Sequence, residues 1–212
     1  MEKTTRYQRM KKMMIDYRSW MILSILIVVF IMLAESVFEK ELFTFDFVIY
    51  DFLVAHRTDF LTKILTVITH FGGAIVLIGM TILGIIFVKK KKYKVIIPIN
   101  LLVIVLINIA LKNFFERPRP DRFRIIEETG FSFPSGHSMA SMAFYGYLIY
   151  LIFTNVKDKK IRNILCVLLG VLIFLIGFSR IYLGVHYASD VIAGLCFSMA
   201  YLIFMISVGI YR

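Results

Sequence analysis

The chain has 212 residues, of which 59% are hydrophobic and only 18% charged, and its mean hydropathy is +0.81. This composition is too apolar for a soluble domain of that length and indicates an integral membrane protein. The formal net charge of +11 suggests a nucleic-acid partner at first sight. The positions of the cations instead favour a membrane topology signal and a small anionic site, so we expect no nucleic acid.

Six apolar segments separated by short polar connections predict an all-α fold in one domain over residues 1–212. We expect an integral membrane bundle of six transmembrane helices, with a short interfacial helix between the first two. The expected spans cover about residues 19–37, 63–88, 95–112, 137–155, 163–179 and 187–210.

A basic segment precedes the first span, with Lys3, Arg6, Arg9, Lys11, Lys12 and Arg18. Such a start also describes a signal peptide, but its polar lead is long and no clear small-x-small cleavage site follows. We therefore expect an uncleaved anchor. Residues 39–62 are mixed: Phe43–Phe47 alternates like a strand, yet aromatic and acidic residues between two spans favour an interfacial helix.

Orientation follows from the lysines and arginines in alternate connections. The N-terminus, residues 89–94 and 157–162, and Arg212 together hold 16 of the 25. The positive-inside rule then places both termini in the cytoplasm of a multi-pass protein of the cytoplasmic membrane. Lys89–Lys94 is foremost a topology signal, with anionic-lipid binding as a further possibility. Cys166 and Cys196 lie in apolar runs and are interpreted as packing residues rather than as a disulfide or reactive thiols.

The stretch Phe131–Met139 contains Pro134, Ser135 and Gly136 directly before His137 and a long apolar run. A turn that opens a helix here presents free backbone N–H groups, which bind anions. An imidazole at such a site suggests proton transfer to or from a bound oxyanion. This stretch therefore predicts an anion site that includes His137. Under the orientation inferred above, that site faces away from the cytoplasm.

Two further segments come to the same membrane side under this topology. One runs from Lys112 to Pro120 and the other from Ser179 to Asp190. His186 and Asp190 are four residues apart, so on a helix they share a face and the carboxylate can hold one ring nitrogen. The other nitrogen is then left unprotonated as a nucleophile or base.

These segments read Lys-x6-Arg-Pro, Pro-Ser-Gly-His and Ser-Arg-x5-His-x3-Asp, with intact spacing from Lys112 to Asp190. In this the sequence resembles the type-2 phosphatidic acid phosphatase superfamily of membrane lipid phosphatases, which is related to the vanadium haloperoxidases and glucose-6-phosphatase. The resemblance implies that His186 attacks phosphorus, that Asp190 orients it, and that His137 protonates the leaving oxygen and later activates water. It implies phosphate binding by Lys112, Arg119, Ser135, Gly136 and Arg180, with Pro120, Pro134 and Ser179 in support.

No cofactor or metal is expected, because three fixed cations can neutralise the phosphate as a metal ion does elsewhere. His137, His186 and Asp190 could ligate a metal by residue type, but Lys112, Arg119 and Arg180 would repel it. His56 and His70 are interpreted as structural, although His70 could line a substrate passage. Arg117, Arg122 and Arg124 are left open between headgroup contacts of a solvated loop and substrate binding.

The resemblance thus implies a metal-independent lipid phosphatase at the outer face of the cytoplasmic membrane, acting through a phosphohistidine on a lipid phosphate or pyrophosphate. It suggests the bacterial type that hydrolyses undecaprenyl pyrophosphate or phosphatidylglycerophosphate. A lipid phosphotransferase would carry the same signature. A non-catalytic lipid-binding protein would carry damage at a motif position, and none is visible. The oligomeric state cannot be predicted from the sequence.

Overall fold

The computed structural model describes residues 6–41 and 43–211, and within these ranges it contains eight α-helices and no strand. The helices are α1 (Arg6–Phe38), α2 (Thr44–Ala55), α3 (Asp59–His70), α4 (Ala74–Phe87), α5 (Lys91–Phe115), α6 (Gly136–Asn155), α7 (Lys159–Tyr182) and α8 (Ala188–Ser207). The predicted all-α class is confirmed. Lys3 and Arg212, which entered the orientation count, lie outside the described residues.

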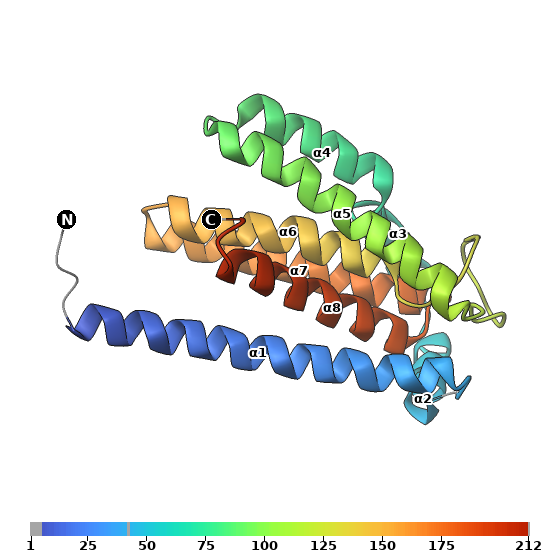
Figure 1. The fold of residues 1–212 in the computed structure, drawn as a ribbon. Helices are drawn as coiled ribbons and strands as arrows, with labels where there is room; N and C mark the ends of the chain where they lie inside the picture. The colour runs from blue at the N-terminus through green and yellow to red at the C-terminus, as the bar shows by residue number, and fades with distance from the viewer. Residues whose placement is uncertain (1–5, 42, 212) are drawn as a thin grey trace.

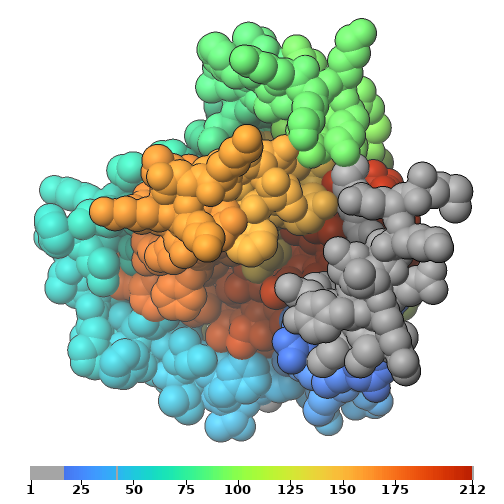
Figure 2. All heavy atoms as spheres, turned by 90° about the vertical axis from the view of Figure 1, so that its left-hand side faces the viewer, coloured from blue at the N-terminus to red at the C-terminus, as the bar shows by residue number. Residues whose placement is uncertain are grey.

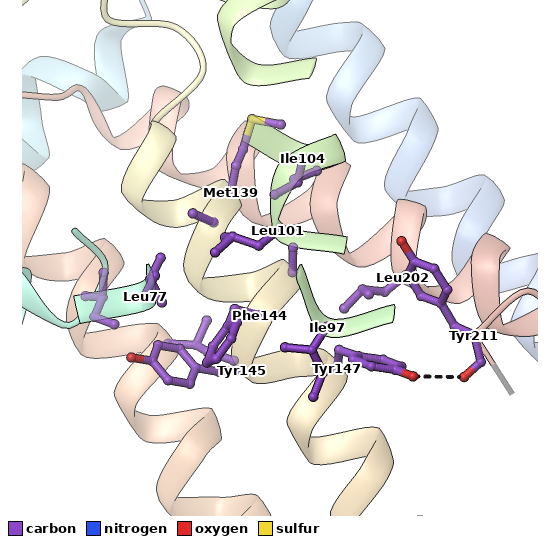
Figure 3. Packing of buried hydrophobic residues seen from close by; sticks show 14 of the residues in the cluster. Leu77, Ile97, Leu101, Ile104, Met139, Phe144, Tyr145, Tyr147, Leu202 and Tyr211 are labelled. Carbon is purple, nitrogen blue, oxygen red and sulfur yellow. Dashed lines mark hydrogen bonds between the residues drawn. The ribbon is translucent and has the colours of Figure 1, made fainter. Parts of the chain in front are cut away.

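Helix α6 is the centre of the bundle. It packs against α5, α7 and α8, and α1 runs along the outside of α8 (Figure 1). Ala140 and Ala143 let neighbouring helices approach closely, while Met139, Phe144 and Tyr145 fill the core (Figure 3). The core also buries a polar group: the Tyr147 hydroxyl donates to the Tyr211 carbonyl oxygen at 3.2 Å. Helix α6, whose first turn carries part of the candidate site, is therefore enclosed by α5, α7 and α8.

The outer faces of the long helices are apolar. Large side chains lie exposed there, such as Ile75 on α4 at 89% and Phe174 on α7 at 63%. In water such surfaces would drive association, whereas a bilayer covers them. In the part of the chain that the structure describes, four helices are long and apolar enough to cross a membrane: α1 from Tyr17, α5, α7 and α8. The chain is thus a multi-pass membrane protein.

Two expected spans differ from this set. The segment expected at 63–88 is divided into α3 and α4, which meet at an angle of 48° and pass the same test only as a pair. The break falls at Gly72-Gly73, where glycine weakens the helix. Helix α6 matches the span expected at 137–155 but is not among the candidates, because serines and tyrosines lower its hydropathy. The number of six spans therefore stays a prediction.

Residues 44–55 form the helix α2 and not a strand, as the sequence favoured. One face of α2 buries Asp46, Tyr50 and Leu53, and the opposite face exposes Phe45, Phe47, Val48 and Phe52. A buried acidic residue on a short helix with an apolar outer face is unusual, since an unpaired charge is costly to bury. The partners of Asp46 belong to the candidate site and are described below.

The basic connections lie together at the end of the bundle away from the polar loop 116–135. Figure 2 looks at that end and shows the turns between α4 and α5 (green) and between α6 and α7 (orange). Lys90 donates from Nζ to Asn155 Oδ1 at 2.7 Å and so joins the two turns. The loop 116–135 lies at the opposite end, where α5 and α7 finish and α6 and α8 begin (Figure 1).

Candidate active site

Four helix ends and one loop build the site. The backbone N–H of Ser135 donates to the Asp190 carbonyl at 3.1 Å and joins the start of α6 to α8. The N–H of Ser132 donates to the Arg117 carbonyl at 2.8 Å, and that of Ile125 to the Leu183 carbonyl at 3.0 Å. The loop is thereby folded back over the helix ends, and the three sequence motifs meet in one region.

His186 and Asp190 form a buried pair, exposed by only 1% and 0%. Asp190 Oδ2 lies 3.3 Å from His186 Nδ1 and accepts from the Tyr187 backbone N–H at 2.9 Å. Sequence analysis placed both residues on one helix face, but α8 begins only at Ala188, with Tyr187 as its N-cap. The contact is nevertheless made, because Asp190 turns back toward the segment before the helix.

The environment of His186 favours the neutral ring. Burial is the largest cause that lowers its pKa, to about 4, with Arg180 and Arg119 acting in the same direction and Asp190 opposing them. A proton on Nδ1, held by Asp190, leaves Nε2 unprotonated, with its lone pair as a hydrogen-bond acceptor. That atom faces the Arg119 Nη1 at 3.1 Å. The ring therefore presents a nucleophilic nitrogen beside a cation.

The three expected phosphate-binding cations surround this point, each held by the protein. Lys112 donates to the Phe131 carbonyl at 2.6 Å, and Arg119 to the carbonyls of Val185, Gly130 and Thr129 at 2.9–3.0 Å. Arg180 is 1% exposed and donates from Nη1 to Thr69 Oγ1 at 2.8 Å. Neutral backbone carbonyls hold Lys112 and Arg119 in place and leave their charge available to an anion.

Arg180 also forms an ion pair with Glu128 through its second terminal nitrogen. Burial would raise the pKa of Glu128, but the charges of Arg180 and Arg119 outweigh burial and hold that pKa below its ordinary value. The Glu128 carboxylate thus occupies a donor that the sequence analysis assigned to phosphate. The Nε of Arg180 is buried without a hydrogen-bond partner.

The Pro-Ser-Gly-His segment opens α6 as expected. Ser135 is the N-cap, and its hydroxyl accepts from the Ser138 backbone N–H at 3.4 Å. A Cβ on Gly136 would lie 2.9 Å from Asn108 Oδ1, so glycine is required where the helix start meets α5. Pro134 supports this contact, since its carbonyl accepts from Asn108 Nδ2 at 3.0 Å.

The His137 ring lies against the break between α3 and α4. A Cβ on Gly72 would approach its Cδ2 to 3.2 Å, and one on Gly73 would lie 3.7 Å from its Nε2. The ring makes no hydrogen bond to any residue of the described part of the chain. It is within electrostatic range of Arg180, His186, Lys112 and Arg119. The structure thus brings His137 and His186 to one cluster of cations.

The remaining expected residues have simpler surroundings. Ser179 is buried and donates to the Ile176 carbonyl of its own helix at 2.6 Å. Arg124 donates to the carbonyl oxygens of Pro120 and Arg119, behind the site. Both other histidines are exposed: His56 contacts the Phe52 carbonyl, and His70 ends α3. Within the described ranges, no group of three or more His, Cys, Asp or Glu side chains is arranged to hold a metal ion.

Sequence reasoning missed several buried polar partners. Arg117 was left open as a loop contact, but it is 5% exposed and paired with Asp190 and Asp46. Ser132 donates to Asp190 Oδ2 and lies 3.3 Å from His186 Nδ1. Thr69 and Glu128 were not named either. One available signal was Asp46, an acidic residue flanked by phenylalanines, which needs a buried cation if it faces inward.

The chain was compared with known proteins. A family model described as "PAP2 superfamily" matches residues 93–212. Phosphatidylglycerophosphatase B of Bacillus subtilis is 32% identical over 184 residues, which cover 85% of this chain and 90% of that protein. Undecaprenyl-diphosphatase of Sulfolobus acidocaldarius is 27% identical over 140 residues, covering 63% of this chain and 64% of that protein.

Two solved structures are similar in fold. The crystal structure of a transmembrane PAP2 type phosphatidylglycerolphosphate phosphatase from Bacillus subtilis has a TM-score of 0.78 at 28% identity, over 89% of this chain and 94% of that one. Aquifex aeolicus LpxE has a TM-score of 0.62 at 25% identity, over 78% and 96%. The family match covers more than half of the chain and includes the three motifs and the buried His186–Asp190 pair, so the protein belongs to the PAP2 superfamily.

Proposed function

We propose that the protein hydrolyses lipid phosphate or pyrophosphate monoesters without a metal ion, through a phosphohistidine, at the outer face of the cytoplasmic membrane. Membership of the PAP2 superfamily and similarity to two lipid phosphatases make the chain an enzyme, a phosphatase of lipid phosphates. The mechanism, the side of the membrane that the site faces, and the substrates are proposed here. Undecaprenyl pyrophosphate and phosphatidylglycerophosphate are the proposed substrates, after the relatives' names.

The observation that carries the mechanism is the position of His186. Its Nδ1 contacts Asp190, and its Nε2 points at Arg119, which is where a phosphate would neutralise that cation. Nε2 attacks phosphorus, and the bond between phosphorus and the leaving oxygen breaks. His137 donates a proton to that oxygen. Water then attacks phosphorus, His137 accepts a proton from it, and the bond from phosphorus to His186 breaks to release phosphate.

The cations carry most of the catalytic effect in this scheme. Phosphoryl transfer needs in-line positioning and neutralisation of the phosphate oxygens more than covalent chemistry. Lys112, Arg119 and Arg180 supply the charge from α5, the loop and α7. Ser135 and the backbone N–H groups at Gly136 and His137 supply hydrogen bonds from the start of α6. Hydrogen bonds hold these groups in place before substrate binds, and at Arg180 the phosphate meets the Glu128 carboxylate that is already paired with it.

An apolar groove of about 480 Å³ supports a lipid substrate. It runs between α4 and α5 to the start of α6, and its walls include Leu77, Ile78, Leu101, Leu102 and Val105, with His137 and Gly136 at its polar end. An acyl or prenyl chain fits such walls, since burial of each CH₂ contributes about 0.8 kcal/mol. The headgroup would then lie beside His137.

We further propose that the single domain crosses the membrane six times, with α3 and α4 together as the second span and α6 as the fourth. The positive-inside rule supports cytoplasmic termini, because the basic turns at 89–94 and 157–162 lie at the end of the bundle opposite the site. The exposed phenylalanines of α2 support its interfacial position. The site then faces away from the cytoplasm.

The test measures phosphate release by the purified protein from a panel of lipid phosphates and pyrophosphates in buffer with a chelator. Release is expected for the wild type and is expected to be abolished in His186→Ala. His56→Ala is the matched control, since His56 is exposed and remote from the cation cluster. Dependence of the wild type on added divalent metal would contradict the mechanism. Formation of a phosphorylated lipid in place of free phosphate would indicate a phosphotransferase.

A further inference from the structure

Asp46 and Arg117 are two buried charges that the motifs do not specify: Asp46 lies outside all three, and Arg117 occupies an unspecified position of Lys-x6-Arg-Pro. They are exposed by 1% and 5%. Asp46 also lies outside residues 93–212, the range matched by the family model. Burying a charge costs free energy unless an opposite charge and hydrogen bonds compensate for the lost water. Here the compensating partners are Ser189 and Asp190, at the start of α8.

Arg117 bridges two carboxylates. Its Nη1 donates to Asp190 Oδ1 at 2.6 Å, and its Nη2 donates to Asp46 Oδ2 at 3.0 Å. The Tyr187 ring lies beside it, with the guanidinium carbon 4.2 Å from the ring centroid. A planar guanidinium can hold both acids and stack on a ring at once, which the ammonium of lysine cannot do.

Asp46 also closes the open end of α8. The Ser189 backbone N–H donates to Asp46 Oδ1 at 2.8 Å, and the Ser189 hydroxyl donates to Asp46 Oδ2 at 2.5 Å. The first N–H groups of a helix have no partner within it, and a carboxylate there is favoured by the helix dipole. Asp46 therefore caps α8 from a different helix, at the turn that carries Asp190.

The carboxylate of Asp190 is thereby fixed at both oxygens. Oδ2 faces His186, Ser132 and the Tyr187 backbone N–H, and Oδ1 receives Arg117. We propose that Asp46 and Arg117 are positioning residues, which hold Asp190 in the geometry that orients His186 and make α2 part of the active-site frame. This inference rests on the proposed function.

Charges from every neighbouring element act on the His186–Asp190 pair. They are Arg117, Arg119 and Glu128 of the loop, Lys112 of α5, His137 of α6 and Arg180 of α7. Asp46 of α2 acts through Arg117, with which it is paired. Arg117 is the cation in direct contact with the carboxylate. Without its charge, Asp190 attracts a proton to the pair more strongly. The acid limb of the pH–rate profile is therefore expected to move to higher pH.

The experiment compares purified Asp46→Asn, Arg117→Gln and Arg117→Lys with the wild type on the best lipid substrate of the panel. Mutation of residues that orient a catalytic group typically costs 10- to 100-fold, so we expect kcat to fall by about that factor in Asp46→Asn and Arg117→Gln. KM should change little, since neither residue is assigned to phosphate. In the pH profile of kcat/KM, the midpoint of the acid limb should move to higher pH by about one unit in Arg117→Gln. In Arg117→Lys, which keeps the positive charge, the midpoint should stay at the wild-type pH.

Asp51→Asn is the matched control on α2, because Asp51 is exposed, and Lys157→Gln removes one exposed cation at the far end of the bundle. Both should retain wild-type kinetics. Wild-type kcat in Asp46→Asn and Arg117→Gln would overturn the inference, as would a loss of kcat with an unmoved acid limb. If Arg117→Gln does not fold, the kcat of Asp46→Asn and Arg117→Lys is decisive. Both should fall below the wild-type value, since neither variant keeps the bridge between the two carboxylates intact, and wild-type kcat in both would overturn the inference. Absence of phosphate release by the wild type would instead reject the proposed function.

Discussion

Replacement of Glu128 by glutamine is expected to tighten the binding of inorganic phosphate, the product of the proposed reaction. Glu128 forms an ion pair with Arg180, whose side chain is 1% exposed. Phosphate that uses the same guanidinium must displace this carboxylate or bind beside it against its negative charge. Either event costs free energy that glutamine, which is neutral and nearly the same size, would largely remove.

The magnitude follows from the kind of hydrogen bond that is lost. A hydrogen bond to a charged group contributes about 1.5–3 kcal/mol and one between neutral groups about 1 kcal/mol. The Glu128 side chain is 29% exposed, so solvent screens part of its charge and the lower end applies. The difference of about 0.5 kcal/mol corresponds to a roughly twofold lower inhibition constant for phosphate.

The assay is competitive inhibition of lipid phosphate hydrolysis by inorganic phosphate. Because the pKa of Glu128 lies below its ordinary value, its carboxylate stays charged between about pH 5.5 and 8. The two variants are compared at one pH in this range, so that the phosphate carries the same charge in both assays. Glu127→Gln is the matched control, since Glu127 is the neighbouring exposed carboxylate. An unchanged or higher inhibition constant in Glu128→Gln would refute the reasoning and would mean that Glu128 helps to hold Arg180 for phosphate.

Two further predictions concern the histidines. Gly72→Ala should lower kcat at least tenfold, because the new Cβ would lie 2.6 Å from Ile176 Cγ2 and 3.2 Å from His137 Cδ2 and would displace the His137 ring. Gly79→Ala on α4 is the control, since its Cβ meets open space and the variant should keep the wild-type rate. Equal rates for the two variants would contradict the prediction. His186 should stay neutral down to about pH 4, because burial lowers its pKa. Below the ordinary value near 6.5 the unfolded chain binds the proton and the native ring does not, so this residue's contribution to stability falls as pH drops from about 6.5 to 4. The titration can be followed by NMR of the imidazole signals, since the chain has only four histidines and His186→Ala identifies the signal of His186. A titration midpoint of His186 near pH 6.5 would contradict the expected effect of burial.

The parts predicted best from sequence are those specified by local pattern. Long apolar runs predicted the helices, and fixed spacings predicted that Lys112, His137 and His186 belong to one site. The break at Gly72-Gly73 was harder to predict, because the glycine pair lies within an otherwise continuous apolar segment. Gly72 lies against Ile176 and His137, which are far along the chain and carry no signal in a local window.

Asp46 and Arg117 show the same limit for the site. They are 71 residues apart, and neither belongs to a spaced motif with its partner. Their roles depend on which face of α2 turns inward, and that is decided by tertiary packing against α8 and not by the residues of α2 alone. His186 is a milder case: the four-residue spacing to Asp190 predicted the contact, but the helix begins after His186, so the contact is made by a cap and not by a shared face.

The position of the lipid groove supports the proposed division of labour between the histidines. In-line displacement requires the nucleophile and the leaving oxygen on opposite sides of phosphorus. The leaving oxygen stays attached to the lipid, so it must lie toward the groove, and the groove is lined by His137 and Gly136 but not by His186. His186 instead faces Arg119 and Asp190 at the start of α8. In the proposed mechanism, a phosphate held between α6 and α8 would therefore meet His186 as nucleophile on one side and His137 as proton donor on the other, with the lipid tail directed into the bilayer.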